Sequence, residues 1–285
     1  MVKTIAVLTD FSAGSVHATR YAMHMAQKMK AKILLFSLSP VTANRRLKFA
    51  GIDEWLQDES APDNLLVGFC NAMNLLQQQS TFPTAYRPEI SYNNESSEME
   101  DIMTSIGNDD QVVLLVTPLL GCEDLSSFIA GDTCSKIIDW ASVPVLVIPA
   151  GAAIKNYEKI AFVTTLHQQD INAIAWLGEL IEVFAADLMV AHLNEDPGDC
   201  LKTAAEQTLS RGLYEKTDYG RIYFRSIPDL HPQKDWEWLK ANKKTDLLAL
   251  VQRSREQMTA FFKRGQNIQR TLHLHIPVMI LPKMP

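Results

Sequence analysis

Short apolar runs alternate with longer amphipathic stretches along the whole chain. The runs are rich in Val, Ile and Leu, which is typical of strands that are buried on both faces. The stretches between them place apolar residues at helical spacing. In the first half, this pattern predicts strands over 5–8, 33–38, 85–92, 112–116 and 145–148, separated by helices over 13–30, 64–79, 96–106 and 133–140.

The second half shows the same order of elements. Strands are predicted over 159–164, 188–192, 221–225, 247–251 and 278–281, and helices over 171–185, 199–214, 233–241 and 256–272. Strands that alternate with helices form parallel sheets with helices on both faces. The sequence therefore predicts an α/β fold with a doubly wound parallel sheet in each half.

The two halves also resemble each other in sequence. KTIAVLTDF matches EKIAFVTTL without a gap, and the match pairs Ile5 with Ile160, an offset of 155 positions. VPVLVIP matches IPVMILP, which pairs Val143 with Ile276 at an offset of 133. Internal similarity of this kind indicates a repeated unit. We therefore predict two domains, residues 1–150 and 157–285, joined by a small and partly polar linker.

Composition and charge narrow the class of protein. Hydrophobic residues make up 47% of the 285 residues, which is enough for a sizeable core, and the formal net charge is −6. A nucleic-acid binder normally presents a basic face, so we expect no nucleic-acid partner. The four cysteines form no CxxC pair, and no apolar run approaches the roughly 20 residues that span a membrane. We expect a cytoplasmic protein with no signal peptide and no membrane partner.

A strand that ends in TDFS, a long helix, a second strand, a late glycine-containing loop and a closing VPVLVIP strand resemble the universal stress protein family. Two such copies in one chain resemble a tandem universal stress protein. The resemblance implies two five-stranded parallel sheets of strand order 3-2-1-4-5, similar to the adenine-nucleotide α-hydrolases. In such sheets a ligand lies beyond the carboxyl ends of the strands. Family members with the full glycine loop bind ATP, and the others form a second class whose role does not depend on ATP in the same way.

The loop positions that hold phosphate in the family are occupied by Pro118, Gly121, Gly131 and Asp132. Glycines let backbone N–H groups approach phosphate oxygens, and a helix N-terminus favours an anion. Pro118 removes one donor, and Asp132 places a carboxylate where phosphate charge is expected. The local interpretation is that Asp132 caps the helix that follows it.

The same loop positions of the second half carry no glycine in place. They read Val251, Ser254, Arg264 and Gly265. We therefore expect no nucleotide in the second domain.

Asp10 is the other diagnostic residue. The resemblance implies that it contacts the adenosine part of a ligand, whereas its repeat partner Thr165 has no carboxylate. The local interpretation is that Asp10 caps the helix that begins near Ala13. Leu38 is expected either as an apolar wall for a base or as ordinary core. The complete set of candidate nucleotide-binding residues is Thr9, Asp10, Leu38, Thr117, Gly121, Gly131, Asp132 and Thr133.

Three functions remain open at this point. The first is a stress-response regulatory or interaction module, with at most weak adenine-nucleotide binding in the first domain and no catalytic or metal-binding residues. Its domains would pair through the edge strands 145–148 and 278–281, a homodimer would be compatible, and it would act on a further protein partner. The second is an enzyme that hydrolyses ATP or transfers a nucleotidyl group, for which Asp10, Asp132 and Glu123 are the candidate metal-holding acids. The third is a nucleoside sensor. We predict the first.

Overall fold

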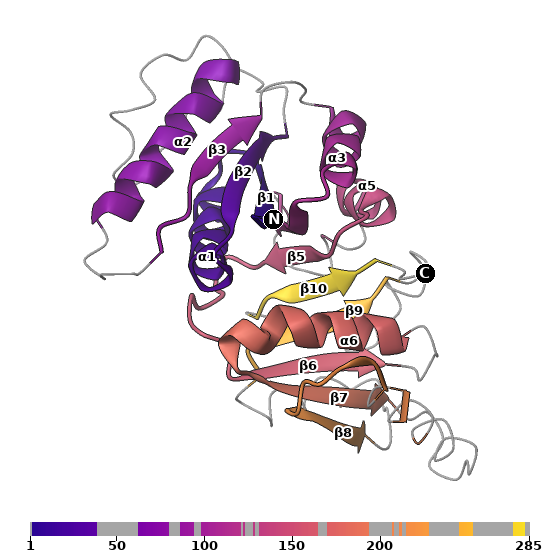
Figure 1. Cartoon of the computed structure of the whole chain (residues 1–285). Helices are drawn as coiled ribbons and strands as arrows, with labels where there is room; N and C mark the ends of the chain where they lie inside the picture. Colours follow the sequence, from indigo (N-terminus) through magenta and orange to yellow (C-terminus); the bar gives the residue numbers. More distant parts are fainter. Residues whose placement is uncertain are drawn as a thin grey trace. The chain divides into compact units, whose positions relative to one another are not determined.

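The chain divides into two compact units, Met1–Ile154 (unit 1) and Lys155–Pro285 (unit 2), as drawn in Figure 1. The division falls inside the segment that the sequence identifies as a linker. The computed structural model describes residues 2–38, 62–79, 86–93, 98–120, 122, 128, 131–164, 170–193, 207, 211–212, 215–227, 245–252 and 276–282.

The described part of unit 1 forms a sheet of parallel strands. These are β1 (Thr4–Thr9), β2 (Lys32–Ser37), β3 (Ile90–Asn93), β4 (Val112–Pro118) and β5 (Val145–Ile148). Their order across the sheet is β3-β2-β1-β4-β5, and each neighbouring pair is parallel. The first strand of the chain therefore lies in the middle of this sheet.

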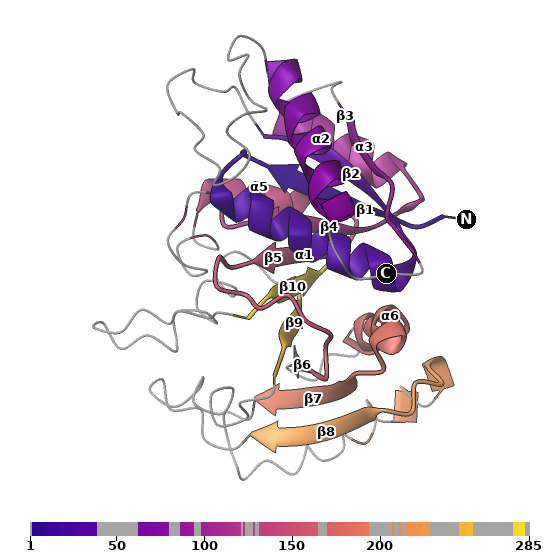
Figure 2. The same ribbon diagram turned by 90° about the vertical axis from the view of Figure 1, so that its left-hand side faces the viewer.

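The helices of unit 1 cover both faces of the sheet. They are α1 (Ala13–Met29), α2 (Pro62–Gln79), α3 (Met99–Asn108) and α5 (Asp132–Trp140). Figures 1 and 2 show α1 and α2 on one face and α3 and α5 on the other. Right-handed crossovers require this division, because the chain moves one way along the sheet through α1 and α2 and the other way through α3 and α5.

Unit 2 has the same strand order. Its strands are β6 (Lys159–Thr164), β7 (Asp187–Leu193), β8 (Ile222–Ile227), β9 (Leu247–Val251) and β10 (Val278–Leu281). They follow one another across the sheet as β8-β7-β6-β9-β10, and each neighbouring pair is parallel. The helix α6 (Asp170–Ile181) ends in a 3-10 turn, η1 (Glu182–Phe184). The helices predicted over 199–214, 233–241 and 256–272 lie wholly or mostly outside the described residues.

The pairing register is also the same in the two units. Ile5 pairs with Ile33 and Leu114, and Ile160 pairs with Leu188 and Leu247, which lie at the sequence offsets of 155 and 133. Both first helices are followed by a residue in the left-handed region, Lys30 with φ 53° and Ala185 with φ 51°. The predicted fold class, α/β with doubly wound parallel sheets in the order 3-2-1-4-5, is confirmed.

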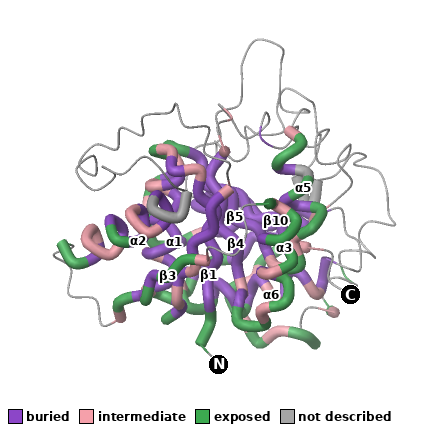
Figure 3. The backbone as a smooth tube through the Cα atoms, turned by 90° about the horizontal axis from the view of Figure 1, so that it is seen from above, coloured by how far each residue is buried: buried purple, intermediate pink, exposed green. Residues whose placement is uncertain are grey.

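The core of each unit lies around its central strands (Figure 3). Every residue of β1 is buried, and so is every residue of β9. Burial on both faces explains why these strands appear in the sequence as unbroken apolar runs rather than as alternating patterns.

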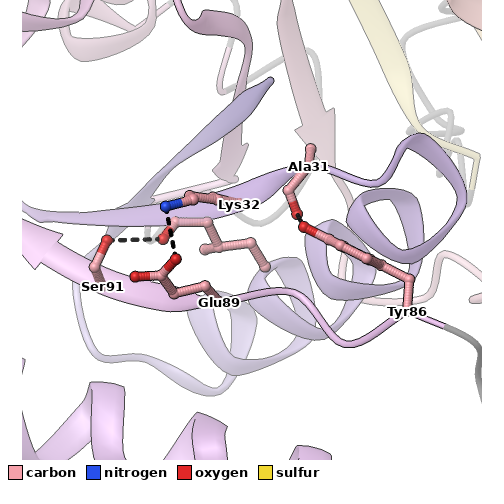
Figure 4. A network of polar contacts seen from close by, with 6 residues as sticks. Ala31, Lys32, Tyr86, Glu89 and Ser91 are labelled. Atoms are coloured by element: carbon pink, nitrogen blue, oxygen red, sulfur yellow. Dashed lines mark hydrogen bonds and ion pairs between the residues drawn. The ribbon is translucent and has the colours of Figure 1, made fainter. Parts of the chain in front are cut away.

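The strand predicted over 85–92 is shorter than expected, because ladder pairing begins only at Ile90. Pro88 lies in the preceding segment and cannot donate a backbone hydrogen bond to a neighbouring strand. Side chains hold this segment instead (Figure 4). Tyr86 donates its hydroxyl to the carbonyl of Ala31 at 3.1 Å, and Glu89 pairs with Lys32 at 2.7 Å.

Candidate functional site

The carboxyl end of β1 is held by short-range hydrogen bonds. The Thr9 hydroxyl accepts the backbone N–H of Phe11 at 3.0 Å, and Phe11 adopts a left-handed conformation with φ 60°. The backbone carbonyl of Thr9 accepts the N–H of Leu38 at 2.9 Å. The ends of β1 and β2 therefore lie side by side, and the chain turns sharply away from the sheet immediately after β1.

Asp10 lies in this turn and is half-buried. Its Oδ1 accepts the backbone N–H of Ser12 at 3.0 Å and the hydroxyl of Ser15 at 2.5 Å. The Ser15 hydroxyl in turn accepts the N–H of Asp10 at 3.0 Å. Among the described residues, both hydrogen bonds to this carboxylate end on Oδ1. Oδ2 therefore keeps its capacity to accept a hydrogen bond from a ligand.

The prediction that Asp10 caps α1 is wrong. The N-cap residue is Ser12, whose hydroxyl accepts the N–H of Ser15 at 3.2 Å. A serine with extended φ and ψ immediately before the first helical residue satisfies a donor that the helix leaves free. Because Ser12 caps α1, the Asp10 carboxylate does not act as the helix cap. Ser12 and Ser15 instead hold it in place through Oδ1.

The carboxyl end of β4 lies next to β1 in the sheet. Thr117 is fully buried and donates its hydroxyl to the carbonyl of Pro118 at 3.0 Å. The hydroxyl therefore forms a local hydrogen bond and is not presented to a ligand. Pro118 is the last residue of β4 and pairs with Ile148 of β5. A Cβ added to Gly14 would lie 3.6 Å from the Cβ of Pro118, which places the first turn of α1 beside the end of β4.

The start of α5 differs from the prediction in one respect. Gly131 is the N-cap residue and Asp132 is the first helical residue, so the prediction that Asp132 caps the helix is wrong. Asp132 and Thr133 are both exposed. Gly131 has φ −76° and donates its N–H to the carbonyl of Phe128 at 3.0 Å. An acidic residue in the first turn is favourable there because the helix dipole is positive at this end.

The candidate residues therefore fall into three groups. Thr9, Asp10 and Leu38 lie together at the ends of β1 and β2, whereas Thr117 is enclosed in β4. Gly131 caps α5, and Asp132 and Thr133 are its first two residues. Because α5 connects the parallel strands β4 and β5, it starts from the carboxyl edge of the sheet. Gly121 and Glu123 lie outside the described residues.

Unit 2 has a different arrangement at the equivalent positions. Asp170 aligns with Ser15 at the offset of 155, and it is fully buried at the start of α6. Its Oδ2 accepts the hydroxyl of Thr164 at 2.6 Å. Thr164 is the last residue of β6 and aligns with Thr9. The carboxylate of unit 2 is thus enclosed between strand and helix, while that of unit 1 lies in the turn outside them.

Among the other unit 2 counterparts of the unit 1 candidate positions, the structure describes only Val251. Val251 is the last residue of β9 and is buried. Thr165, Ser254, Arg264 and Gly265 lie outside the described residues.

Sequence reasoning missed Ser12 and Ser15, the two serines that hold the Asp10 carboxylate. Ser12 and Ser15 could have been recognised, because a serine just before a helical pattern is an N-cap signal. Across the ranges from residue 2 to 282 that the structure describes, no group of three His, Cys, Asp or Glu side chains could hold a metal ion.

No helix within the described segments is long and apolar enough to cross a membrane. No protein-family model matches the chain. No curated protein matches it in sequence.

Solved structures do match the fold. A universal stress protein from Archaeoglobus fulgidus covers 98% of this chain with 96% of its own length, at 12% identity and a TM-score of 0.58. A proposed universal stress protein from Pseudomonas aeruginosa covers 99% with 93% of its own length, at 12% identity and a TM-score of 0.54. The chain therefore has the fold of universal stress proteins over nearly its whole length.

A third similar structure is the cytoplasmic domain of a prokaryotic cation chloride cotransporter. It covers 99% of this chain with 96% of its own length, at 10% identity and a TM-score of 0.56. The same fold thus occurs in proteins that differ in their overall task. Likeness at this level of identity shows the fold alone, and function has to be argued from the site.

Proposed function

We propose that this chain is a tandem protein of the universal stress type, whose first unit binds an adenine nucleoside or nucleotide weakly and whose second unit does not. Binding has a regulatory role in this proposal, and the chain acts on a further protein partner rather than as an enzyme. The observation that carries the proposal is the orientation of Asp10 at the end of the central strand of unit 1.

Asp10 lies where open α/β sheets bind ligands. The connection after β1 leads to β2 on one side, and the connection after β3 leads to β4 on the other side. Between strands whose connections diverge in this way, the carboxyl ends leave room for a ligand. The carboxylate is held there by Ser12 and Ser15 through Oδ1, and Oδ2 is left to accept a hydroxyl or amino group of a ligand.

The repeated strand order and register support the tandem part of the proposal. Unit 2 nevertheless encloses its carboxylate, since Asp170 is fully buried and accepts the Thr164 hydroxyl. Because Asp170 has no exposed surface, its carboxylate is not presented to a ligand. One binding site per chain follows from this difference.

Calorimetric titration of the full chain with adenosine, AMP and ATP tests the proposal. We expect one site per chain, and we expect Asp10→Asn to weaken adenosine binding about tenfold or more, since hydrogen bonds to charged groups contribute roughly 1.5–3 kcal/mol. Asp109→Asn is a matched control, because Asp109 precedes β4 and lies at the opposite edge of the same sheet. Its affinity should equal that of the unmodified protein.

Two results would count against the proposal. Two equivalent sites per chain would show that unit 2 also binds. Magnesium-dependent turnover of ATP would favour the enzyme alternative and assign Asp10 a catalytic role instead.

A further inference from the structure

His17 connects helix α1 to the start of the segment that joins the two units. It lies in the second turn of α1, and its imidazole forms a hydrogen bond with the backbone of Ala152. Ala152 is 3% exposed and closes the turn after β5 by donating its N–H to the carbonyl of Pro149 at 3.0 Å. The beginning of the linker is therefore buried in unit 1 and is held there in part by a side chain that titrates near neutral pH.

The Nε2 atom of His17 is not suited to carry a proton in this position. It is buried and makes no hydrogen bond with any residue that the structure describes. When the neutral ring donates to Ala152 through its other nitrogen, Nε2 carries only a lone pair, and protonation turns it into an N–H donor. A buried, charged donor without an acceptor is costly, so the contact with Ala152 favours a neutral ring.

The surroundings of His17 add no charge that would stabilise a protonated ring. The charged side chain that acts on it is Arg20 of the same helix, which repels a second cation. The strands β1, β4 and β5, which pack on α1, contain no ionisable side chain, and Lys32 of β2 is paired with Glu89 at 2.7 Å. Burial lowers the pKa of His17 below 6.5, and the hydrogen bond to Ala152 opposes this shift without cancelling it.

The remaining ionisable groups near the two ends of this contact are engaged or carry no negative charge near neutral pH. Those of α1 and its flanks are Asp10, Tyr21, His24, Lys28 and Lys30. Asp10 is the one carboxylate among them, and Ser12 and Ser15 bind its Oδ1. In the linker, Lys155 forms an ion pair with Asp246.

We propose that His17 is an acid-sensitive latch, which holds the start of the linker against α1 while the ring is neutral and releases it when the ring is protonated. Protonation favours whichever arrangement gives the ring the higher affinity for a proton, and that is the one in which the ring is exposed. The latch is therefore closed above about pH 6.5 and opens as the pH falls through the pKa of the buried ring. This inference goes beyond the proposed function, because it requires no ligand.

Amide hydrogen exchange of the full chain at pH 7.5 and pH 5.5, corrected for the intrinsic effect of pH on exchange, tests the latch. We expect the Ala152 amide to exchange about three- to tenfold faster at pH 5.5, where an exposed histidine of pKa 6.5 limits the gain to roughly tenfold. In His17→Gln the corrected rate should be the same at both pH values, because glutamine does not titrate.

His24→Gln is the matched control. His24 lies two turns further along α1 and is half-buried like His17. This variant should keep the acceleration of the unmodified protein at Ala152. A lost acceleration would show that His24, and not His17, senses the acid, and would overturn the inference.

Low concentrations of urea separate a local release from a general loss of stability. A local opening exposes little surface, so the Ala152 rate at pH 5.5 should hardly change with urea, whereas an opening that requires global unfolding becomes more frequent. A rate that rises with urea as global unfolding does, or an unmodified protein that shows no acceleration at pH 5.5, would overturn the latch. Both results come from the unmodified protein and do not depend on how well a variant folds.

Discussion

At the scale of single residues, the site depends on which polar groups the fold satisfies and which it leaves unsatisfied. Ser12 and Ser15 meet the needs of the α1 N-terminus and of Asp10 Oδ1. Asp10 Oδ2 and Ser37 Oγ form no hydrogen bond with the residues that the structure describes. The proposed binding role follows from Asp10 rather than from a glycine loop.

His17 gives the protein a predictable response to acid. It lies on α1, and burial holds the pKa of its imidazole below the usual value of 6.5. A hydrogen bond to the backbone of Ala152 opposes the shift, and the charge of Arg20 adds to it. Its Nε2 is buried without a partner among the described residues, so a proton placed there finds no acceptor.

The sign of the pH effect follows from this shift. Because the folded pKa lies below the unfolded one, the contribution of His17 to stability is present above about pH 6.5 and is lost as the pH falls through the folded pKa. We expect His17→Gln to lose less unfolding free energy than the unmodified protein between pH 7.5 and pH 5. Urea titrations at both pH values measure this. An equal loss in the two proteins would contradict the lowered pKa.

At the scale of elements, apolar runs predicted the buried strands well. The bounds of β5, β6, β9 and β10 agree with the sequence prediction, since burial on both faces leaves a continuous run with abrupt ends. The edge strand β3 was predicted less well, because half of its pairing is absent and Pro88 and side-chain contacts decide where it begins. The helix predicted over 171–185 extends too far, because α6 ends at Ile181 and the chain continues as a 3-10 turn.

The candidate site was predictable only in part. Asp10 stood out through the TDFS motif, and its carboxylate does lie at the end of the central strand. Ser12 and Ser15 were not identified, although a serine just before a helical pattern is a local N-cap signal. Ser37 was not identified because its strand neighbour is distant in sequence. Ser37 and Thr9 are 28 positions apart (37 − 9) and meet only through strand pairing.

The start of β9 depends on one buried carboxylate. The side chain of Asp246 is 2% exposed, and its Oδ2 accepts the backbone N–H groups of Glu158 at 2.7 Å and Lys159 at 3.0 Å. Its Oδ1 forms an ion pair with Lys155, whose side chain is 55% exposed. Asp246 therefore holds the segment entering β6 against β9.

Replacing Asp246 should destabilise unit 2 more than replacing its ion-pair partner. Asp246→Ala removes the carboxylate that accepts the backbone N–H groups of Glu158 and Lys159, and we expect a loss of about 2–4 kcal/mol in unfolding free energy. Lys155→Met removes a partner that is itself 55% exposed and leaves both backbone donors on Asp246, so it should cost less, about 1 kcal/mol. Chemical unfolding followed by circular dichroism measures both variants. Similar losses in the two would show that the ion pair, and not the backbone contacts, is what matters.

At the scale of the whole molecule, the pairing of the two units stays a prediction from sequence, as does a homodimer. If the edge strands β5 and β10 pair, the backbone N–H groups of Val145–Ile148 that do not bond to β4 should exchange slowly with deuterium. The N–H groups on the free side of the outer strand β3 provide the comparison within the same unit. Fast exchange at both edges would contradict the pairing, and sedimentation velocity reports whether chains associate further. The cytoplasmic location also stays a prediction.

The central place of β1 has a consequence for how the chain is made. β1 is synthesised before its neighbour β4, which begins only at Val112, about a hundred residues later (112 − 9 = 103). During that interval an unbroken apolar strand has only one of its two final neighbours available. Exposed apolar strands in incomplete chains are prone to aggregate, and distant strand pairing forms slowly. We therefore expect the nascent unit 1 to be most prone to aggregate before β4 is available to pair with β1.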